Sequence, residues 1–406
     1  MVTKSPILGL FCLVVSQQQH TMSYLMSNYA PLAVTFTKGE GCYLTDTQGE
    51  KYLDALSGVG VVGLGHCHKD ITATIQTQAG ELLHTSNWYH IAHQETLAEK
   101  LCKLSNMDNA FFGNSGAEAN EAAIKIARLH GHANNIDNPT ILTANQSFHG
   151  RTMATLSATG NDKVQAGFAP LVSEFIHIDF NDVDAIKAHR NNNNIVAVML
   201  EPIQGESGVI IPKRDYLNQV QAICQANNWL LILDEVQTGI GRTGKMFAHQ
   251  YNHITPDVLT LAKGLGNGVP IGACLAKGKA TTLFTPGTHG STFGGNPLVC
   301  KTALSVLEII EKDKLLDNAT KMGEYLVSNF QEKLSNSNKM TQIRAKGLMI
   351  AIELNQDCTQ LLNAALSKHL LINITGRSIR LLPPLIINQT EADIIIDTVC
   401  DLIGEL

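Results

Sequence analysis

The side chains best suited to chemistry in this chain are Lys263 and Asp234, because each stands where an apolar run ends. Lys263 follows residues 258–262, and Asp234 follows residues 229–233. If both runs are buried strands of an open α/β sheet, they deliver an amine and a carboxylate to the edge where such sheets bind ligands. An amine that forms a Schiff base, with an acid to pair with a pyridine nitrogen, is the equipment of pyridoxal phosphate (PLP) chemistry. A strand-end lysine or aspartate taken alone more often faces solvent, so the neighbouring motifs must decide.

A second feature is the segment N-S-G-A-E-A-N, which predicts the start of a helix over residues 115–130. Ser115 and Glu118 have the spacing of a capping box, and Gly131 suits the helix end. The free N–H groups of such a helix start attract anions. A plain capped helix is the commoner meaning of this pattern, but Gly116 favours a phosphate, since it lets an anion approach the backbone.

Two strand-end loops carry further polar groups. Phe148 could stack on a flat cofactor, and Arg151 could bind a carboxylate with two hydrogen bonds. Glu201 and Glu206 follow a strand over residues 195–200. Carboxylates in such a place are costly unless they face solvent, a cation or a binding site. These loops therefore belong with the candidate site.

Three weaker motifs have competing interpretations. Residues 239–245 spell G-x-x-x-x-G-K, which suggests a nucleotide-hydrolysing ATPase, but Met246 replaces the Ser or Thr that binds Mg²⁺. The acid-ending strand also precedes this loop directly instead of following later, so the ATPase is disfavoured. Residues 66–68, His-Cys-His, lack a second cluster at zinc spacing and are interpreted as a polar turn, with no metal site. Residues 290–297 form either an ordinary glycine-rich loop or a second phosphate-binding element.

Composition narrows the class of protein. The 406 residues are 44% hydrophobic and 16% charged, with a net charge of −6 and no long basic run. These values indicate a globular protein and argue against nucleic-acid binding. Nine cysteines without a C-x-x-C pair are typical of reduced thiols in the cytoplasm.

The N-terminus allows two interpretations. The apolar stretch over residues 6–15 has the length of a signal-peptide core, but no convincing cleavage site follows, and it is too short to span a bilayer. A mis-assigned start, with Met22 or Met26 as the true first residue, is the favoured alternative. We therefore expect residues 1–26 to be an extension, the protein to be cytoplasmic, and no membrane association.

The rest of the chain predicts an α/β fold. Strand-like pieces between residues 43 and 56 are broken by a turn at Asp46–Gly49, and beyond about residue 70 helices alternate with strands. Strands are predicted over residues 139–144, 195–200, 229–233, 257–262, 347–353 and 378–382, and helices over residues 300–311 and 313–334 and at the C-terminus. The alternation indicates a mainly parallel sheet in a large domain over residues 76–300. Residues 27–75 and 301–406, from both chain ends, would form a smaller α+β domain.

Together these motifs resemble the class III PLP-dependent aminotransferases, from about Tyr29 to the C-terminus. The most specific matches are FFGNSGAEANEAAIKIAR (111–128), SFHGRT (147–152), EPIQGESGV (201–209), LILDEVQTGIGRTGK (231–245), LAKGLGNGVPIG (261–272) and GSTFGGNP (290–297). The resemblance implies a PLP-dependent transferase of fold type I. It also places the P-loop lookalike in a loop of this family.

The resemblance implies a role for each matching cofactor residue. Lys263 would hold PLP covalently, and Asp234 would keep its pyridine nitrogen protonated. The remaining PLP contacts would be Val236 and Phe148 on the two ring faces, Gln237 near the ring hydroxyl, and Ser115, Gly116 and Ala117 around the phosphate. Thr292 of a second subunit would complete the phosphate site, which implies a homodimer.

Substrate residues carry over in the same way. Arg151 would bind a substrate carboxylate with Ser291 nearby, and Glu206 with Arg380 would match the pair that alternates between amino-acid and 2-oxoglutarate substrates. Val59 stands where ornithine-using relatives have Tyr. The chain departs from the family pattern at Lys69 and at residues 91–93, near the expected substrate entrance.

The resemblance is closest to family members that use N²-acetyl-L-ornithine as amino donor and 2-oxoglutarate as acceptor. We expect N-acetyl-L-glutamate 5-semialdehyde and L-glutamate as products, in arginine biosynthesis. Alternative donors are succinylornithine, succinyldiaminopimelate, ornithine and 4-aminobutyrate. An aminomutase is disfavoured, because the Glu206–Arg380 pair implies two alternating substrates. A non-catalytic PLP-binding relative is disfavoured by the presence of Lys263 and Asp234.

Overall fold

A computed structural model describes residues 24–406 of the chain. Residues 24–34 belong to a separate N-terminal unit, Met1–Val34, and contain no helix or strand. Residues 35–406 form one compact unit, which carries all elements described below. The expected extension over residues 1–26 lies almost entirely outside the described residues, and the proposed boundaries near residues 75 and 300 stay predictions.

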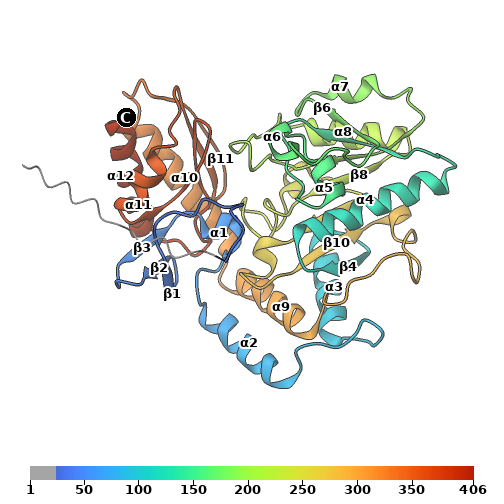
Figure 1. Cartoon of the computed structure of the whole chain (residues 1–406), viewed down its shortest axis with the longest axis horizontal. Helices are drawn as coiled ribbons and strands as arrows, with labels where there is room; N and C mark the ends of the chain where they lie inside the picture. Colours follow the sequence, from blue (N-terminus) through green and yellow to red (C-terminus); the bar gives the residue numbers. More distant parts are fainter. Residues whose placement is uncertain (1–23) are drawn as a thin grey trace, which may run out of the picture. The chain divides into compact units, whose positions relative to one another are not determined.

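A seven-stranded sheet forms the centre of this unit (Figure 1). Its order is β4 (Asn109–Gly113), β10 (Gly272–Ala276), β9 (Val258–Leu261), β8 (Leu230–Asp234), β7 (Ile195–Leu200), β5 (Thr140–Ala144) and β6 (Phe175–Ile178). The run from β9 to β6 is parallel, whereas β10 is antiparallel to both of its neighbours. The prediction of an α/β fold with a mainly parallel sheet is thus confirmed.

Strand β8 shows why the sheet is covered on both faces. Its side chains are all buried, and they alternate between two hydrophobic clusters: Leu230 and Ile232 join one, Leu231 and Leu233 the other. The first cluster includes apolar residues of α4 (Gly116–Ala133) and the second includes those of α8 (Tyr216–Ala226). Because successive strand residues point to opposite faces, α4 and α8 pack on opposite sides.

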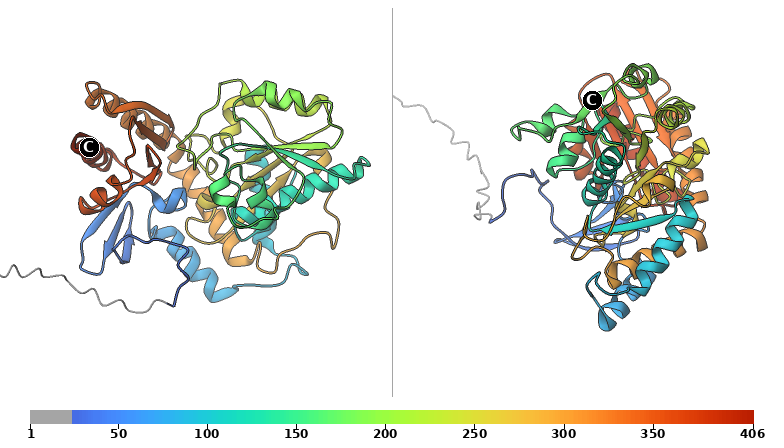
Figure 2. Two further views of the ribbon diagram at one scale, coloured as in Figure 1. Left: turned by 45° about the horizontal axis from the view of Figure 1, so that its top comes forward. Right: turned by 90° about the vertical axis from the view of Figure 1, so that its right-hand side faces the viewer.

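Residues 35–406 also form two smaller four-stranded sheets, drawn in blue and red in Figure 2, and the first of them joins strands from both ends of this unit. The first contains β1 (Phe36–Glu40), β2 (Tyr43–Asp46), β3 (Lys51–Asp54) and β13 (Leu370–Leu371), and β13 pairs in parallel with β3. The second contains β11 (Met340–Lys346), β12 (Met349–Leu354), β15 (Ser378–Leu381) and β14 (Asn373–Thr375). Helices α10 (Leu315–Lys333) and α12 (Gln389–Glu405) pack together, and α10 contacts β11.

The remaining elements are shorter or lie around the central sheet. They are α1 (Ser57–Gly60), α2 (Lys69–Glu81), α3 (Ala92–Ser105), α5 (Met153–Ala158), α6 (Asp162–Gln165), α7 (Val183–Ala188), α9 (Pro297–Lys312), α11 (Leu361–Ser367), η1 (Ala248–Asn252), η2 (Lys263–Leu265) and η3 (Gly278–Ala280). Within the described part of the chain, no helix combines the length and apolar character needed to cross a bilayer.

The predicted end of the helix over residues 115–130 and the predicted end of one strand both need correction, and the helix comes first. It continues to Ala133, so Gly131 lies inside it and does not end it. A Cβ at Gly131 would lie 2.6 Å from the Pro139 side chain, so glycine is needed there for close packing. The strand predicted over residues 229–233 extends to Asp234, so the acid itself is the last residue of β8.

Candidate active site

Lys263 and Asp234 lie at the same edge of the central sheet, as predicted. Asp234 ends β8, and Lys263 opens η2 one residue after the adjacent parallel strand β9. Lys263 has a positive φ of 42°, a strained conformation of the kind that clusters at functional sites. Burial lowers the pKa of its amine, and the charges of Glu206, Arg380 and Asp234 also act on that pKa. The four side chains therefore form one cluster.

Asp234 is held by a buried hydrogen-bond network. Its Oδ2 accepts from Asn120 Nδ2 at 2.7 Å and lies 2.8 Å from His149 Nδ1, and its Oδ1 accepts from the Val236 backbone at 3.0 Å. Asn120 also donates to the His149 carbonyl and accepts from Thr260 Oγ1 at 2.7 Å. Side chains from α4, the loop after β5 and β9 thus fix the orientation of one carboxylate on β8.

Arg380 and Glu206 form a bidentate ion pair. Arg380 Nη1 and Nη2 each lie 3.0 Å from a different carboxylate oxygen of Glu206. Arg380 also donates to Asn373 at 3.0 Å and, at 3.4 Å, to Thr375 and to Gln237 Oε1, and Gln237 Nε2 donates to Glu206 at 3.2 Å. Burial raises the pKa of Glu206, but Arg380 outweighs that effect and the net pKa is lowered, so the pair is charged.

The start of α4 departs from the predicted capping box in one half. Ser115 Oγ accepts from the Glu118 backbone at 3.1 Å, as predicted, but the Glu118 carboxylate accepts from the Asn114 backbone instead of that of Ser115. The expected reason for Gly116 is also incomplete. A Cβ there would lie 2.7 Å from Val236 Cγ1, so glycine is needed for the close approach of Val236. The structure thus brings the helix start and Val236 together.

The loop with Phe148 and Arg151 lies against the same helix. A Cβ at Gly150 would lie 3.0 Å from the Ala117 side chain, which places the loop beside the first turn of α4. Phe148 is half-buried, and the guanidinium of the exposed Arg151 lies 5.6 Å from its ring centroid. An aromatic face and a free guanidinium therefore stand next to each other near the helix start.

Glu201 joins this loop to the one that carries Glu206. Its carboxylate accepts from the Phe148 backbone and from the Gly205 backbone, each at 3.0 Å. Burial raises its pKa to about 7, with a smaller opposing effect of His149. A carboxyl group that titrates near neutrality thus bridges the two loops.

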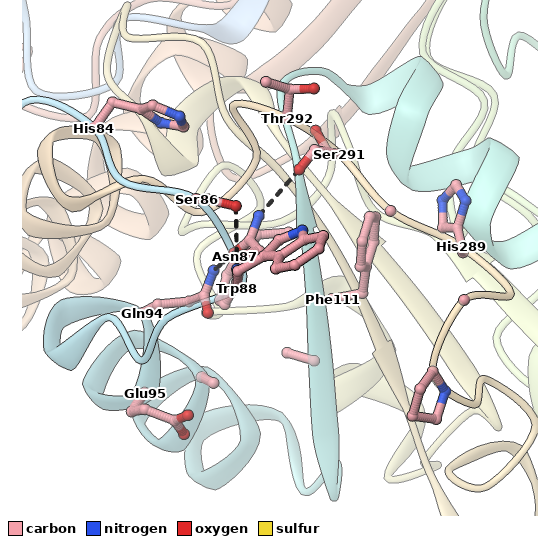
Figure 3. Close-up of a pocket in the computed structure, with 16 residues that line it drawn as sticks. His84, Ser86, Asn87, Trp88, Gln94, Glu95, Phe111, His289, Ser291 and Thr292 are labelled. Atoms are coloured by element: carbon pink, nitrogen blue, oxygen red, sulfur yellow. Dashed lines mark hydrogen bonds between the residues drawn. The ribbon is translucent and has the colours of Figure 1, made fainter.

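Ser291 and Thr292 lie in a cavity of about 860 Å³ (Figure 3). Asn87 donates to the Ser291 backbone carbonyl at 3.0 Å, and Asn114 donates to Ser291 Oγ at 3.2 Å. Thr292 is exposed, and the residues that line its cavity do not include Lys263. Within one chain the structure therefore links Ser291 to the start of α4 through Asn114, but leaves Thr292 outside the cluster around Lys263.

Val59 is half-buried and packs on a small hydrophobic cluster that includes Ile203 and Leu382. Its φ is 66°, which is a genuine outlier for a β-branched residue. Ile203 lies in the loop that runs from β7 to Glu206, so Val59 lies beside that loop. This strained backbone could not be predicted from the residue types around Val59.

Sequence reasoning missed Asn120, His149 and Thr260 as supports of Asp234. Each stood inside or beside a quoted motif, and a polar residue within an apolar strand, such as Thr260, was the available signal. In residues 66–68, His66 Nε2 lies 2.7 Å from Asp54 Oδ2, and no group of three metal-binding side chains occurs among residues 24–406.

The cluster fits PLP. The Lys263 amine has no hydrogen-bond or ion-pair partner within residues 24–406, and His149 Nε2 is buried without one. A partner-free amine, a hydrogen-bonded carboxylate and a helix start at one sheet edge are the groups that a phosphorylated pyridine aldehyde requires. These groups suit a Schiff-base lysine, a partner for the ring nitrogen and a phosphate site.

Comparison with known proteins agrees with this chemistry. The family described as "Aminotransferase class-III" matches residues 24–403. The acetylornithine aminotransferase of Nitrosomonas europaea is 53% identical over 94% of this chain and 98% of its own length, and acetylornithine aminotransferase 1 of Bordetella pertussis is 48% identical over 95% and 98%.

Solved structures of aminotransferases also resemble this chain. The ornithine aminotransferase of Toxoplasma gondii superposes with a TM-score of 0.91 at 33% identity, covering 94% of this chain and 93% of its own. The acetylornithine aminotransferase of Elizabethkingia anophelis superposes with a TM-score of 0.84 at 33% identity, covering 94% and 97%. This chain belongs to the class-III aminotransferases and is a PLP-dependent enzyme.

Proposed function

We propose that the enzyme transfers the terminal amino group of N²-acetyl-L-ornithine to 2-oxoglutarate in the cytoplasm, as a step of arginine biosynthesis. The products are N-acetyl-L-glutamate 5-semialdehyde and L-glutamate. The observation that carries the proposal is the bidentate Glu206–Arg380 pair beside Lys263. A cation that exchanges its carboxylate partner suits a reaction with two alternating substrates, only one of which brings a second carboxylate to that position.

The residues around Lys263 divide the work. PLP, when bound, supplies the electron sink that lets an amino group pass between two carbon skeletons. Lys263 holds the cofactor, and burial of its amine favours the neutral form that can act as nucleophile and base. Asp234, fixed by Asn120 and His149, keeps the pyridine nitrogen protonated.

The other cofactor contacts are proposed from the family pattern, and the position of Val236 at the start of α4 supports them. Ser115, Gly116 and Ala117 offer the free N–H groups of the α4 start to the phosphate. Val236, pressed against that start, and Phe148 cover the two ring faces, while Gln237 lies near the ring hydroxyl. Aromatic and aliphatic side chains at these positions also exclude water from the ring.

Substrate carboxylates have two cations available. Arg151 is exposed, without an ion-pair partner among residues 24–406, and binds the α-carboxylate of the substrate, with Ser291 nearby. Arg380 pairs with Glu206 while the acyl donor is bound and accepts the second carboxylate of 2-oxoglutarate when Glu206 moves aside. Bidentate pairing suits both states, because the guanidinium matches any carboxylate.

The homodimer is the remaining part of the proposal. Thr292 reaches the phosphate site of the partner subunit. Large apolar side chains on and near its loop support association: Trp88 is 91% exposed and Phe293 60%. Leu82 and Leu83, at the end of α2, are exposed as well.

Mixing two inactive variants tests this arrangement. Lys263→Ala and Thr292→Ala homodimers are combined under conditions that allow subunits to exchange. If Thr292 acts across the interface, each mixed dimer contains one intact site, with its lysine from one subunit and its threonine from the other. We expect recovery of up to about half the wild-type activity per mixed dimer. Absence of recovery in verified mixed dimers places Thr292 in its own subunit's site.

Donor preference tests the substrate. A free α-amine beside Val59 would lose a charge-assisted hydrogen bond worth about 1.5–3 kcal/mol, or roughly tenfold to a hundredfold in rate. The N²-acyl group removes that charge and tolerates the apolar wall. We therefore expect kcat/KM for N²-acetylornithine to exceed that for ornithine by at least about tenfold.

Two variants of one position sharpen this test. Val59→Tyr introduces a hydroxyl and should narrow the gap between the two donors, whereas Val59→Phe adds the same ring without the hydroxyl and should not. Both replace a β-branched residue at positive φ, so neither adds that source of strain. Equal use of ornithine, or a preference for 4-aminobutyrate, succinylornithine or succinyldiaminopimelate, would overturn the acetylornithine assignment and leave the aminotransferase intact.

A further inference from the structure

A second cavity, of about 430 Å³, lies between the segment that follows β7, the short helix η1 and the end of strand β11. Its lining includes none of the residues proposed above for PLP or substrate. The charged side chains that line it are Lys213, Arg214 and Lys346, and no acidic residue lines it.

The charge of Lys213 acts on Asp184, whereas Arg214 and Lys346 have no acidic partner among residues 24–406. None of the three side chains has a hydrogen bond or ion pair with a residue in the described range 24–406. The acids near the cavity are engaged elsewhere or act on other groups: Asp184 pairs with Lys187 at 2.9 Å, and Glu324 acts on the phenol of Tyr251.

Of the three cations, Lys346 is the one held in place by the fold. It is half-buried, and its Nζ lies 3.5 Å from the centroid of the Tyr251 ring, whose hydroxyl is held by the Thr243 carbonyl at 2.7 Å. Burial lowers the pKa of Lys346, and the like charges of Arg214 and Lys245 lower it further. Crowded cations without a counter-ion gain stability when an anion binds between them.

The other walls of the cavity are apolar. Pro202 and Ile203 stand on one segment, and Ile211, which is 36% exposed, and Pro212 on the next. Leu217 of α8 contributes a further apolar side chain. An inorganic ion would leave these surfaces in contact with water, whereas an organic ligand would bury them, which favours binding.

We propose that this cavity binds a small organic dianion, with its charged groups held by Lys346 and Arg214 and its apolar body against Ile203 and Ile211. The shared chemistry is two negative charges beside a flat or apolar body, and both an aromatic dicarboxylate and an aryl phosphate ester provide it. The site is independent of the amino donor, because none of its residues belongs to the cluster around Lys263.

Calorimetric titration of the PLP-loaded enzyme tests the site. The probes are isophthalate and phenyl phosphate, with inorganic phosphate as the probe that lacks an apolar body, in about 0.1 M salt to limit non-specific attraction. We expect one saturable site per chain for at least one organic probe, and affinity at least about tenfold weaker for inorganic phosphate. The tighter of the two organic probes identifies the natural ligand as a dicarboxylate or as a phosphate ester.

Three variants distinguish this cavity from other anion sites. Lys346→Met keeps the apolar stem over Tyr251 and removes the charge, and Arg214→Gln changes an exposed side chain that has little part in folding. Each should weaken binding by at least about tenfold. Lys163→Met, which removes one charge from an exposed side chain elsewhere, should not change it. Absence of saturable binding, or binding that survives both cavity substitutions, overturns the proposal.

Discussion

The two charged regions beside Lys263 are built in opposite ways. Asp234 is 4% exposed, and its partners stand on α4, on the loop after β5 and on the backbone beyond β8. Glu206 stands on a loop, and its side chain is 37% exposed although its partner Arg380 is 1% exposed. One acid is fixed in the interior, whereas the other can leave its partner for solvent.

This difference in exposure suits the two acids to different roles in a transfer reaction. A buried carboxylate with three hydrogen-bond partners keeps one position, as a permanent partner of a ring nitrogen must. A buried arginine whose acid is half in solvent can exchange that acid for a substrate carboxylate at modest cost, because Asn373 and Thr375 continue to hold the guanidinium. We call Asp234 with its partners the fixed region and the Glu206–Arg380 pair the exchangeable region. Substitutions in the fixed region should slow the reaction with every substrate, whereas those in the exchangeable region should affect the amino donor and 2-oxoglutarate differently.

The largest effect on activity should come from substitution of Lys263, which lies beside both regions. Lys263→Ala removes the amine proposed to hold PLP covalently at this edge, so turnover should be abolished and the visible absorption of the bound cofactor lost. Lys263→Arg is the matched control, because it keeps a cation but not a nucleophile, and it should be equally inactive. A variant that retained both activity and absorption would show that the cofactor is anchored elsewhere.

Asp234→Ala should follow, with a loss of several orders of magnitude for every donor and acceptor. Each ~1.4 kcal/mol of lost transition-state stabilisation corresponds to about tenfold in rate. Asp234→Asn keeps the shape and most hydrogen bonds, so it should fold better than Asp234→Ala and remain almost as slow. A loss smaller than about tenfold in kcat, or one confined to a single substrate, would remove Asp234 from its role at the ring nitrogen.

Glu206→Gln should separate the two half-reactions. Without the competing carboxylate, Arg380 should bind 2-oxoglutarate more tightly, whereas the donor half-reaction should slow because the buried guanidinium is left uncompensated. Shifts of about tenfold in opposite directions are expected from one charge-assisted hydrogen bond. Single-turnover kinetics of each half-reaction measures both. Glu353→Gln is the control, because it breaks an ion pair with Arg344 on the small sheet that also carries Arg380. Equal effects of the two variants would contradict the proposed exchange of carboxylates at Arg380.

The same contrast explains what the sequence could predict. Strand ends were predictable, because an apolar run that stops at a charged residue marks the edge of a parallel sheet, and so Asp234 and Lys263 were found. Supports that come from distant elements were not. Asn120 meets Asp234 only because α4 crosses β8, and nothing in its local pattern separates it from an ordinary helical residue. The antiparallel strand β10 was missed for the same reason, since its five residues carry no turn signal of their own.

Backbone conformation was equally hidden. Val59 at a φ of 66° breaks the preference of β-branched residues, and such strain depends on tertiary contacts with Ile203 and Leu382. The packing reason for Gly116 was missed and the role of Gly131 was misassigned, because a glycine in a sequence does not tell which neighbour approaches it. In both cases the neighbour comes from another element: Val236 and Pro139.

The smallest effect should come from Glu201, which joins the two regions through the Phe148 and Gly205 backbones. Its pKa is raised from 4.5 to about 7, chiefly by burial. Between these values the folded protein holds a proton that the unfolded chain releases, so stability falls as the pH rises through that window and stays lower above it. The side chain introduced by Glu201→Gln cannot titrate, so this variant does not lose folding stability in that window.

The variant should therefore gain stability relative to the wild type as the pH rises from about 5 to about 7, by on the order of 1–3 kcal/mol, and the difference should level off above that range. Parallel denaturation curves of the two proteins over this range measure it. Activity should change little, because the amide still accepts from one of the two loops. A stability difference that stays constant with pH would show that Glu201 is ionised over the whole of this range. The group that joins the fixed and exchangeable regions would then carry a permanent negative charge.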